Sequence, residues 1–339
     1  MALVAHSGLP AFEELRAERT PVITPGEAAH SGLPDLSIGL LNLMPDAALR
    51  ATDRQFLRLV SGYADVADLW VYVFTVAASH RGPAARQHIS RNYSDFATIT
   101  ELGVDALIVT GANPAHHELS DEAFWPGLNE TFDWAEANTN SVLCSCLATH
   151  AVLERKLGTK RVRLPQKMWG VYSHRLVDDH PLLDGVQTPV AAPHSHWYDI
   201  TRERFEAAGV RVLAESDEAG VHMAVTEDDF YVFFQGHPEY DLVSLLKEYQ
   251  REVARFFSGE AHELPPYPAH YFPERVLDRL EGHREATVKA KATGGELPTL
   301  EEGPLLEGLA NPWTDAGQGI YRNWLNLVET RKYARSLGR

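Results

Sequence analysis

An apolar run that ends in a cysteine and passes at once into a helical pattern constrains this chain more than any other feature. Residues 141–145 read Ser-Val-Leu-Cys-Ser, and Leu147 and Ala148 follow Cys146 without a loop. This order predicts a buried strand, a sharp turn and a helix, with the Cys146 thiol at the turn. The helix N-terminus directs free N–H groups and a positive dipole end at the sulfur, which favours the thiolate. The arrangement is similar to a nucleophile elbow without the glycines of the G-x-S-x-G form; this stretch alone favours a buried structural cysteine.

A second apolar run ends in residues that suit a catalytic thiol. Residues 231–235 predict a buried strand, and Gly236-His237-Pro238-Glu239 follows directly. Active sites of open α/β sheets lie at the carboxyl ends of the strands, where both runs end. We therefore predict that Cys146 is a nucleophile, that His237 removes its proton and that Glu239 orients the imidazole.

Strand-like and helix-like segments alternate along much of the chain. Residues 36–44 are an almost continuous apolar run, as expected for a parallel strand covered on both faces. The alternation predicts the α/β class, with a doubly wound, mostly parallel sheet. Further strands are expected at 20–24, 66–76, 106–110 and 190–192, and as an antiparallel group at 210–214, 221–226 and 231–235. Helices are expected at 11–19, 52–60, 122–136, 241–257 and 321–334, a polar loop with one helical turn at 79–92, an irregular edge segment at 160–187 and a linker at 286–312.

Charge balance and cysteine content exclude several classes of protein. The 339 residues include 31 Lys and Arg against 47 Asp and Glu, a formal net charge of −16, which argues against nucleic acid as the main partner. Cys144 and Cys146 are too close for an unstrained disulfide, and we find neither a signal peptide nor a bilayer-spanning run. We expect a cytoplasmic protein without membrane contact. Its organisation is expected to be an N-terminal extension at 1–35, a large domain at 36–259 and a C-terminal extension at 260–339 packed on that domain.

Several separate motifs in a fixed order carry a resemblance to a known family. They are Leu41-Asn42-Leu43-Met44-Pro45, Thr110-Gly111-Ala112, the Cys146 turn, Gly170-Val171-Tyr172, Ala192-Pro193-His194-Ser195, Gly236-His237-Pro238-Glu239-Tyr240-Asp241 and Asn323-Trp324-Leu325-Asn326. With them the chain resembles the homoserine O-succinyltransferase family, which has a class I glutamine-amidotransferase-like (flavodoxin-like) fold. The resemblance implies acyl transfer from succinyl-CoA to the hydroxyl of L-homoserine in methionine biosynthesis. It also implies succinyl-CoA as co-substrate, no cofactor and a homodimer.

The resemblance assigns roles to individual residues. The family's acyl-accepting cysteine, general base and orienting acid fall on Cys146, His237 and Glu239. Its homoserine-binding lysine, serine and arginine fall on Lys167, Ser195 and Arg251. Without the resemblance, the lysine and the arginine would be read as solvated surface residues. A ping-pong reaction through a cysteine thioester follows, and we expect the backbone N–H groups of Leu147 and Ala112 to stabilise its oxyanion.

Three positions depart from the family pattern or bear on the acyl donor. Asp46 stands where the family often has a lysine, and His196 stands in place of an arginine. The residue linked in the family to the choice of acyl donor falls on Ala115. Glutamate at that position goes with acetyl-CoA and glycine with succinyl-CoA. A small, uncharged alanine leaves room for a succinyl carboxylate and does not repel it, which favours succinyl-CoA.

Three other functions are open to a chain of this kind. The same reaction with acetyl-CoA is one, and glutamine hydrolysis by a related fold is another. A metal-binding or sensor module built on the 16 histidines is the third, but the pairs His116-His117 and His194-x-His196 lack a third ligand at a usual spacing. We therefore expect no metal, and hydrogen-bonded structural roles for His194 and His196.

Overall fold

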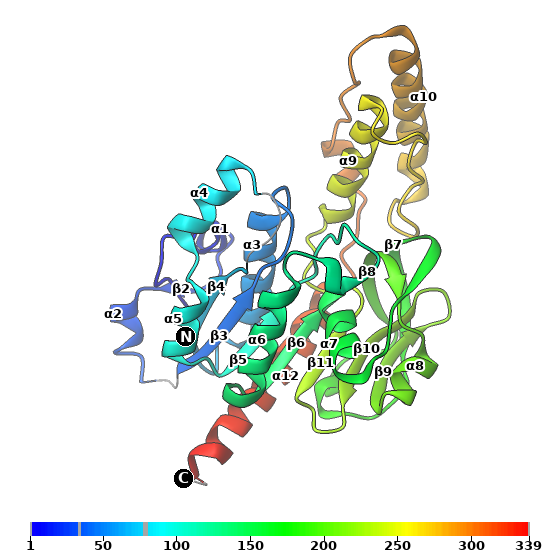
Figure 1. Ribbon diagram of the computed structural model, residues 1–339. Helices are drawn as coiled ribbons and strands as arrows, with labels where there is room; N and C mark the ends of the chain where they lie inside the picture. Colours follow the sequence, from blue (N-terminus) through cyan, green and yellow to red (C-terminus); the bar gives the residue numbers. More distant parts are fainter. Residues whose placement is uncertain (1, 33–34, 77–80, 338–339) are drawn as a thin grey trace.

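The computed structural model describes residues 2–32, 35–76 and 81–337, and its strands join into one wide sheet (Figure 1). The strand order across the sheet is β2-β1-β4-β3-β5-β6-β11-β10-β9-β7-β8. The bounds of the strands are β1 Leu3–Val4, β2 Val22–Ile23, β3 Asp35–Leu41, β4 Asp68–Phe74, β5 Ala106–Val109, β6 Ser141–Ser145, β7 Val162–Leu176, β8 Val190–Asp199, β9 Val210–Ser216, β10 Gly220–Thr226 and β11 Tyr231–Phe234.

The strands from β2 to β11 in this order are parallel to one another. β3 pairs with β4 over its whole length, and β6 lies between β5 and β11. Residues of β5, β6 and β11 are buried throughout because layers cover both faces, which explains the continuous apolar runs. The predicted α/β class and mostly parallel sheet are confirmed. Residues 2–32 contribute β1 and β2 to the same sheet.

The remaining strands are antiparallel. β10 pairs with both β11 and β9, so the predicted antiparallel group is confirmed. The expectation of an irregular segment at 160–187 was wrong, because β7 occupies Val162–Leu176 and pairs with β8. A register irregularity between Arg163 and Met168, and exposed polar residues in the first half of the strand, removed the alternation that would have predicted it. β8 likewise continues well past 192.

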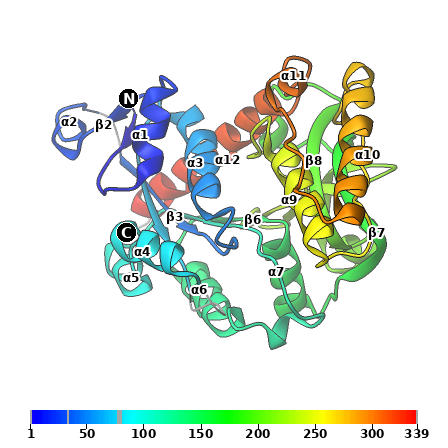
Figure 2. The same ribbon diagram turned by 90° about the horizontal axis from the view of Figure 1, so that it is seen from above.

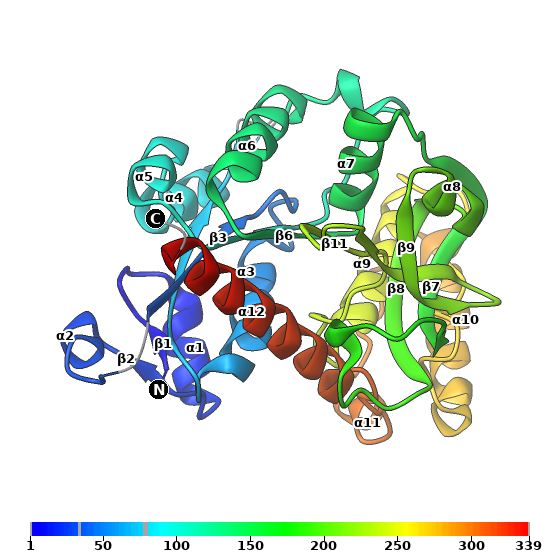
Figure 3. The same ribbon diagram turned by 90° about the horizontal axis from the view of Figure 1, so that it is seen from below.

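Helices cover both faces of the parallel half of the sheet (Figure 3). α6 and α7 lie on one face, whereas α1, α3 and α12 lie on the other, and each layer buries an apolar core. None of the helices in the described part of the chain has the length and apolar character that a membrane span requires. The bounds of the helices are α1 Pro10–Ala17, α2 Pro25–Ala28, α3 Leu49–Val60, α4 Pro83–Asn92, α5 Phe96–Leu102, α6 Trp125–Asn138, α7 Leu147–Leu157, α8 Arg202–Ala207, α9 Ser244–Ser258, α10 Leu277–Thr293, α11 Gly303–Leu306 and α12 Thr314–Leu337.

A lobe built on α9 and α10 rises beyond the sheet (Figure 1) and, seen from above, lies over β7 and β8 (Figure 2). Its core contains Trp169 of β7, Tyr249 of α9 and Leu280 of α10. The expected linker at 286–312 was partly wrong, because α10 continues to Thr293 and α11 follows. α10 has few buried residues, so its sequence lacks a clear apolar stripe.

A helix also replaces most of the polar loop expected at 79–92, of which residues 79–80 lie outside the described residues. α4 begins with Pro83 at its first position, where the missing proline N–H leaves no helical bond unmade. The Asp46 carboxylate accepts a hydrogen bond from the Gly82 N–H at 2.7 Å, which satisfies a free donor at the start of the helix. Ala85 is the residue of α4 that is buried, so its sequence shows little helical periodicity.

Candidate active site

Cys146 lies at the sharp turn between β6 and α7. Its backbone has φ 49° and ψ −107°, in a region that residues with a side chain rarely adopt. The Cys146 N–H donates to the Phe234 carbonyl at 2.6 Å, which ties the turn to β11. A Cβ added to Gly111 would lie 3.4 Å from the Cys146 Cβ, so the turn after β5 packs directly against the cysteine. Strained backbone of this kind gathers at functional sites, and here it carries a thiol whose residue is only 9% exposed.

His237 and Glu239 lie beside this turn because β11 is the parallel neighbour of β6. The Nδ1 of His237 lies 2.7 Å from Oε1 of Glu239, and both side chains are buried. The His237 N–H donates to the Pro193 carbonyl at 2.7 Å, which fixes the loop. Burial lowers the pKa of His237. The Glu239 carboxylate and the nearby Cys146 sulfur raise it by more than burial lowers it, to about 10. The three predicted residues are therefore brought together, with a positively charged imidazole favoured beside the sulfur at neutral pH.

Two buried side chains continue the polar contacts around the sulfur. The Gln235 Nε2 lies 4.0 Å from the Cys146 Sγ, within donor distance of sulfur. The Gln235 Oε1 lies 2.7 Å from Nε2 of His150 on α7. Burial lowers the pKa of His150 to about 4, so its neutral ring can donate Nε2–H to the amide oxygen. The pair orients the Gln235 amide with its N–H group toward the sulfur.

A buried carboxylate joins two of the predicted homoserine-binding residues. Glu248 on α9 accepts hydrogen bonds from the Ser195 hydroxyl at 2.6 Å and from the Lys167 ammonium at 3.2 Å. Its other oxygen accepts from the Tyr240 hydroxyl at 2.8 Å. Burial raises the pKa of Glu248, but Lys167 and the two hydroxyls outweigh it and lower the pKa. A carboxylate that is charged at neutral pH thus faces the same space as Lys167 and Ser195.

Arg251 lies one helical turn beyond Glu248 on α9, on the same side of the helix. It is exposed, and its guanidinium forms no hydrogen bond or ion pair with the part of the chain that the structure describes. The structure therefore places Lys167 and Ser195 in one network and leaves Arg251 beside it with its donors free. Ala115 is also exposed, in the loop that follows β5.

The neighbourhood of Asp46 shows how this chain differs where the family often has a lysine. The Arg81 guanidinium donates to the Met44 carbonyl at 2.6 Å and to the Asp46 carboxylate at 3.1 Å. The Arg81 guanidinium, from the segment before α4, therefore supplies a positive charge at the end of the Leu-Asn-Leu-Met-Pro motif. Arg50 and Arg54, which follow Asp46 closely in sequence, instead form ion pairs with Glu14.

Buried histidines from distant strands meet behind His237. The Nε2 atoms of His174 and His194 lie 3.1 Å apart, and ring nitrogens of His174, His194 and His222 all lie within 4.8 Å of one another. A Cβ on Gly236 would lie 2.8 Å from both His194 Nε2 and His222 Nδ1, so glycine is required there. No third ligand stands at a usual spacing from His194 in the sequence; His174 of β7 and His222 of β10 are brought to it only by the fold.

His196 also differs from the structural role that its sequence suggested. It is buried, yet neither ring nitrogen has a hydrogen-bond partner in the described part of the chain. Burial lowers its pKa well below 6.5, and the charges of His150, His237 and Lys167 lower it further. This histidine is thus close enough to His150, His237 and Lys167 for their charges to act on it, and both of its ring nitrogens are free among the described residues.

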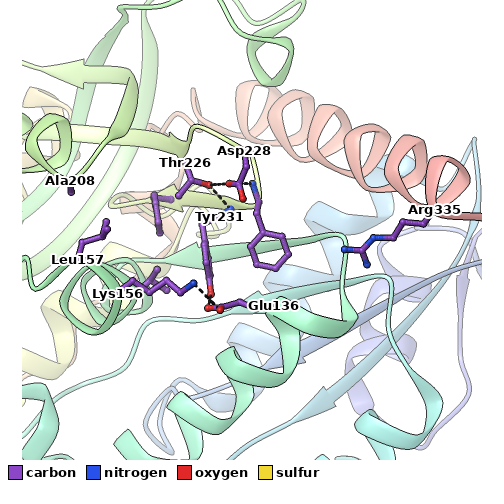
Figure 4. A pocket seen from close by; sticks show the side chains of 11 residues that line it. Glu136, Lys156, Leu157, Ala208, Thr226, Asp228, Tyr231 and Arg335 are labelled. Carbon is purple, nitrogen blue, oxygen red and sulfur yellow. Dashed lines mark hydrogen bonds and ion pairs between the residues drawn. The ribbon is translucent and has the colours of Figure 1, made fainter. Parts of the chain in front are cut away.

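A pocket of about 450 Å³ lies at the opposite edge of the sheet (Figure 4). Glu136 accepts a hydrogen bond from the Tyr231 hydroxyl and forms an ion pair with Lys156. The Asp228 carboxylate accepts a backbone hydrogen bond in the turn before β11. Tyr231 is the first residue of β11, whereas His237 follows the last one. This pocket is therefore separate from the candidate active site.

Comparison with known proteins decides the family. The family model described as homoserine O-succinyltransferase matches residues 2–333. The chain belongs to the homoserine O-succinyltransferase family. The homoserine O-succinyltransferase of Methylococcus capsulatus is 48% identical over 330 residues, covering 97% of this chain and 93% of that protein. That of Thioalkalivibrio nitratireducens is 49% identical over 331 residues, with coverage of 97% and 93%.

Solved structures similar to this homoserine O-succinyltransferase family member include two glutamine amidotransferases. The one from Methylobacillus flagellatus has a TM-score of 0.48 and 14% identity, covering 87% of this chain and 96% of that chain. The one from Thermotoga maritima has a TM-score of 0.45 and 13% identity, covering 87% and 98%.

Membership of the homoserine O-succinyltransferase family confirms the resemblance, whereas the roles of single residues stay predictions. Sequence reasoning missed five residues of the site: Glu248, Tyr240, Gln235, His150 and Arg81. Glu248 carried a usable signal, since an acid three residues before Arg251 shares its side of the helix. Gln235 and His150 gave none, because each is one polar residue within an apolar run.

Proposed function

We propose that this chain transfers the succinyl group of succinyl-CoA to the hydroxyl of L-homoserine, through a thioester on Cys146. The observation that carries the mechanism is the strained Cys146 turn beside the buried His237–Glu239 pair. Membership of the homoserine O-succinyltransferase family supports the substrates, and the product is O-succinyl-L-homoserine for methionine synthesis. No cofactor takes part, because a thiolate and a thioester supply the chemistry.

The first half-reaction transfers the acyl group to the enzyme. The Cys146 sulfur attacks the thioester carbonyl, the new carbon–sulfur bond forms, and the bond to the CoA sulfur breaks. The proton held by His237 passes to the departing CoA thiolate, which leaves the imidazole neutral. The N–H groups of Leu147 and Ala112 stabilise the oxyanion between these events; Leu147 is the first residue of α7, where helix N–H groups are free.

The second half-reaction restores the enzyme. Neutral His237 removes the proton of the homoserine hydroxyl, whose oxygen attacks the Cys146 thioester. The ester bond forms, the bond between carbonyl carbon and Cys146 sulfur breaks, and the sulfur leaves as a thiolate beside the newly charged imidazole. Glu239 stabilises that imidazolium through Nδ1 at 2.7 Å, so the resting state is regenerated.

The Glu248 network supports a binding site for an amino acid. The buried Glu248 carboxylate suits the homoserine ammonium, with Ser195 and Lys167 fixing its position. The free guanidinium of Arg251, one turn further along α9, suits the carboxylate of the same substrate. Opposite charges spaced along one helix thus match the two charged ends of homoserine.

Product formation tests this function directly. Purified enzyme with succinyl-CoA and L-homoserine should release CoA and O-succinylhomoserine in equal amounts, and Cys146→Ala should abolish both. Succinyl-CoA should react faster than acetyl-CoA, since the small, uncharged Ala115 leaves room for the succinyl carboxylate and does not repel it. Product from acetyl-CoA alone would replace succinyl by acetyl in this proposal. We also propose a cytoplasmic homodimer, which light scattering and cell fractionation can test.

A further inference from the structure

A buried arginine near the nucleophile has no carboxylate partner. Arg161 directly precedes β7 and is 6% exposed. Its Nη2 donates to the carbonyls of His116 and His117 at 3.0 and 2.8 Å, and its guanidinium lies 3.9 Å from the centre of the Tyr198 ring. Its Nε and Nη1 form no hydrogen bond, and no acid lies within ion-pair distance, among the described residues. Two of its three donor nitrogens are therefore free.

Burial of a guanidinium without a counter-ion is unfavourable, and other arginines of this chain avoid it. Arg54 and Arg58, both less buried, share the Asp241 carboxylate. The nearest acids do not play that part for Arg161. Glu154 lies 4.0 Å from the Lys160 ammonium and Glu122 accepts the His116 N–H at 2.6 Å, so both acids act on Arg161 only at longer range. An anion that is not part of the chain would compensate this charge.

Arg161 lies near Cys146, to which the acyl group would be bound, because both contact the loop after β5. The loop after β5 begins with Gly111, which packs on the Cys146 Cβ, and it reaches His116 and His117, which Arg161 holds. Arg161 is also close enough to Cys146 for their charges to interact. In a succinyl thioester the carboxylate follows the carbonyl by three C–C bonds of about 1.5 Å each. This length lets the carboxylate of a succinyl group on Cys146 reach well beyond the sulfur, and Arg161 is a cation near enough to receive it.

We propose that Arg161 binds the terminal carboxylate of the succinyl group, in the acyl-CoA and in the Cys146 thioester. This inference rests on the proposed function and adds the residue that selects a dicarboxylic acyl donor.

The other cations nearby are less suited to bind the succinyl carboxylate. Lys160 and Arg163 are exposed, and Lys160 pairs with Glu118. Lys167 is held by Glu248 on the amino-acid side of the site.

Two acyl donors separate this role from a structural one. Butyryl-CoA has the same four-carbon acyl chain as succinyl-CoA but no carboxylate. The rate constant of Cys146 acylation is measured with each donor by quenched intact-protein mass spectrometry, without homoserine. Arg161→Gln should lower the succinyl rate by about 10- to 100-fold, the worth of hydrogen bonds to a charged group. Its butyryl rate should stay within about twofold of wild type, because that chain makes no charged contact.

Matched variants keep the test independent of folding. Arg161→Lys retains the charge and should recover part of the succinyl rate. Arg163→Gln removes an equal charge two residues away, at an exposed site, and should leave both rates unchanged. Wild type itself should prefer succinyl-CoA over butyryl-CoA by about tenfold or more, which needs no variant.

The outcomes distinguish this inference from the proposed function. Equal losses with both donors in Arg161→Gln would make Arg161 a structural residue and overturn the inference. No loss with either donor, or no preference in wild type, would also overturn it. If wild type forms no acyl adduct with any of the donors, the proposed function itself fails.

Discussion

The Nδ1 of His237 lies 2.7 Å from Oε1 of Glu239, in a buried pair that faces the Cys146 turn. Glu239 is the principal group that raises the pKa of His237 against the opposing effect of burial. This relationship keeps the imidazole protonated in the resting enzyme, so that a proton is available for the departing CoA thiolate. The catalytic pH dependence should therefore depend on Glu239.

Glu239→Gln should impair catalysis and shift its pH profile. Loss of the carboxylate lowers the pKa of His237, so the imidazole loses its proton at lower pH and the alkaline fall in kcat/KM for succinyl-CoA moves to lower pH. The rate at neutral pH should drop by about 10- to 100-fold, as expected for one charge-assisted hydrogen bond. Stopped-flow rates of CoA release from pH 6 to 10.5 measure both. An unchanged alkaline limb would contradict the role of Glu239.

Glu248→Gln should separate the two half-reactions. The variant loses the charge that faces the homoserine ammonium but leaves the Cys146 turn intact, so acylation by succinyl-CoA should stay within about twofold of wild type. The kcat/KM for homoserine should fall by about 10- to 100-fold. Glu252→Gln, which changes a half-buried acid paired with Arg255 on the same helix, is the control. A loss confined to the acylation rate would contradict a role for Glu248 in homoserine binding.

Buried histidines should make folding sensitive to acid. Burial lowers the pKa of His222 well below 6.5, and His174 and His237 lower it further by repulsion. The folded state therefore binds no proton there at pH 5 to 6, whereas the unfolded chain does, so stability falls as pH decreases below about 6.5. His222→Gln should reduce the slope of unfolding free energy against pH by up to about 1.4 kcal/mol per pH unit. Urea titrations at pH 5 to 7 measure it; an equal slope in the variant would contradict a neutral His222.

Activity should not require a metal, even though ring nitrogens of His174, His194 and His222 converge. The proposed steps use only a thiolate, an imidazole and backbone donors. Dialysis against a chelator should leave kcat unchanged, and elemental analysis should find no stoichiometric metal ion. A stoichiometric metal whose removal abolishes activity would contradict the mechanism.

The sequence allowed the α/β sheet and the Cys146–His237–Glu239 set to be predicted because both depend on local signals. Apolar runs mark buried parallel strands, and the residues that follow them lie at one edge of the sheet. β7 was missed because its pairing with β8 overrides a polar, irregular sequence. Arg161 and His222 gave no local signal, since their importance comes from neighbours far away in the chain.

The most direct measurement is the intact mass of the protein after mixing with succinyl-CoA in the absence of homoserine. We predict one succinyl adduct per chain, absent from Cys146→Ala and discharged when L-homoserine is added, with O-succinylhomoserine as product. An adduct that persists in Cys146→Ala, or product formation without any adduct on a competent time scale, would contradict a Cys146 thioester.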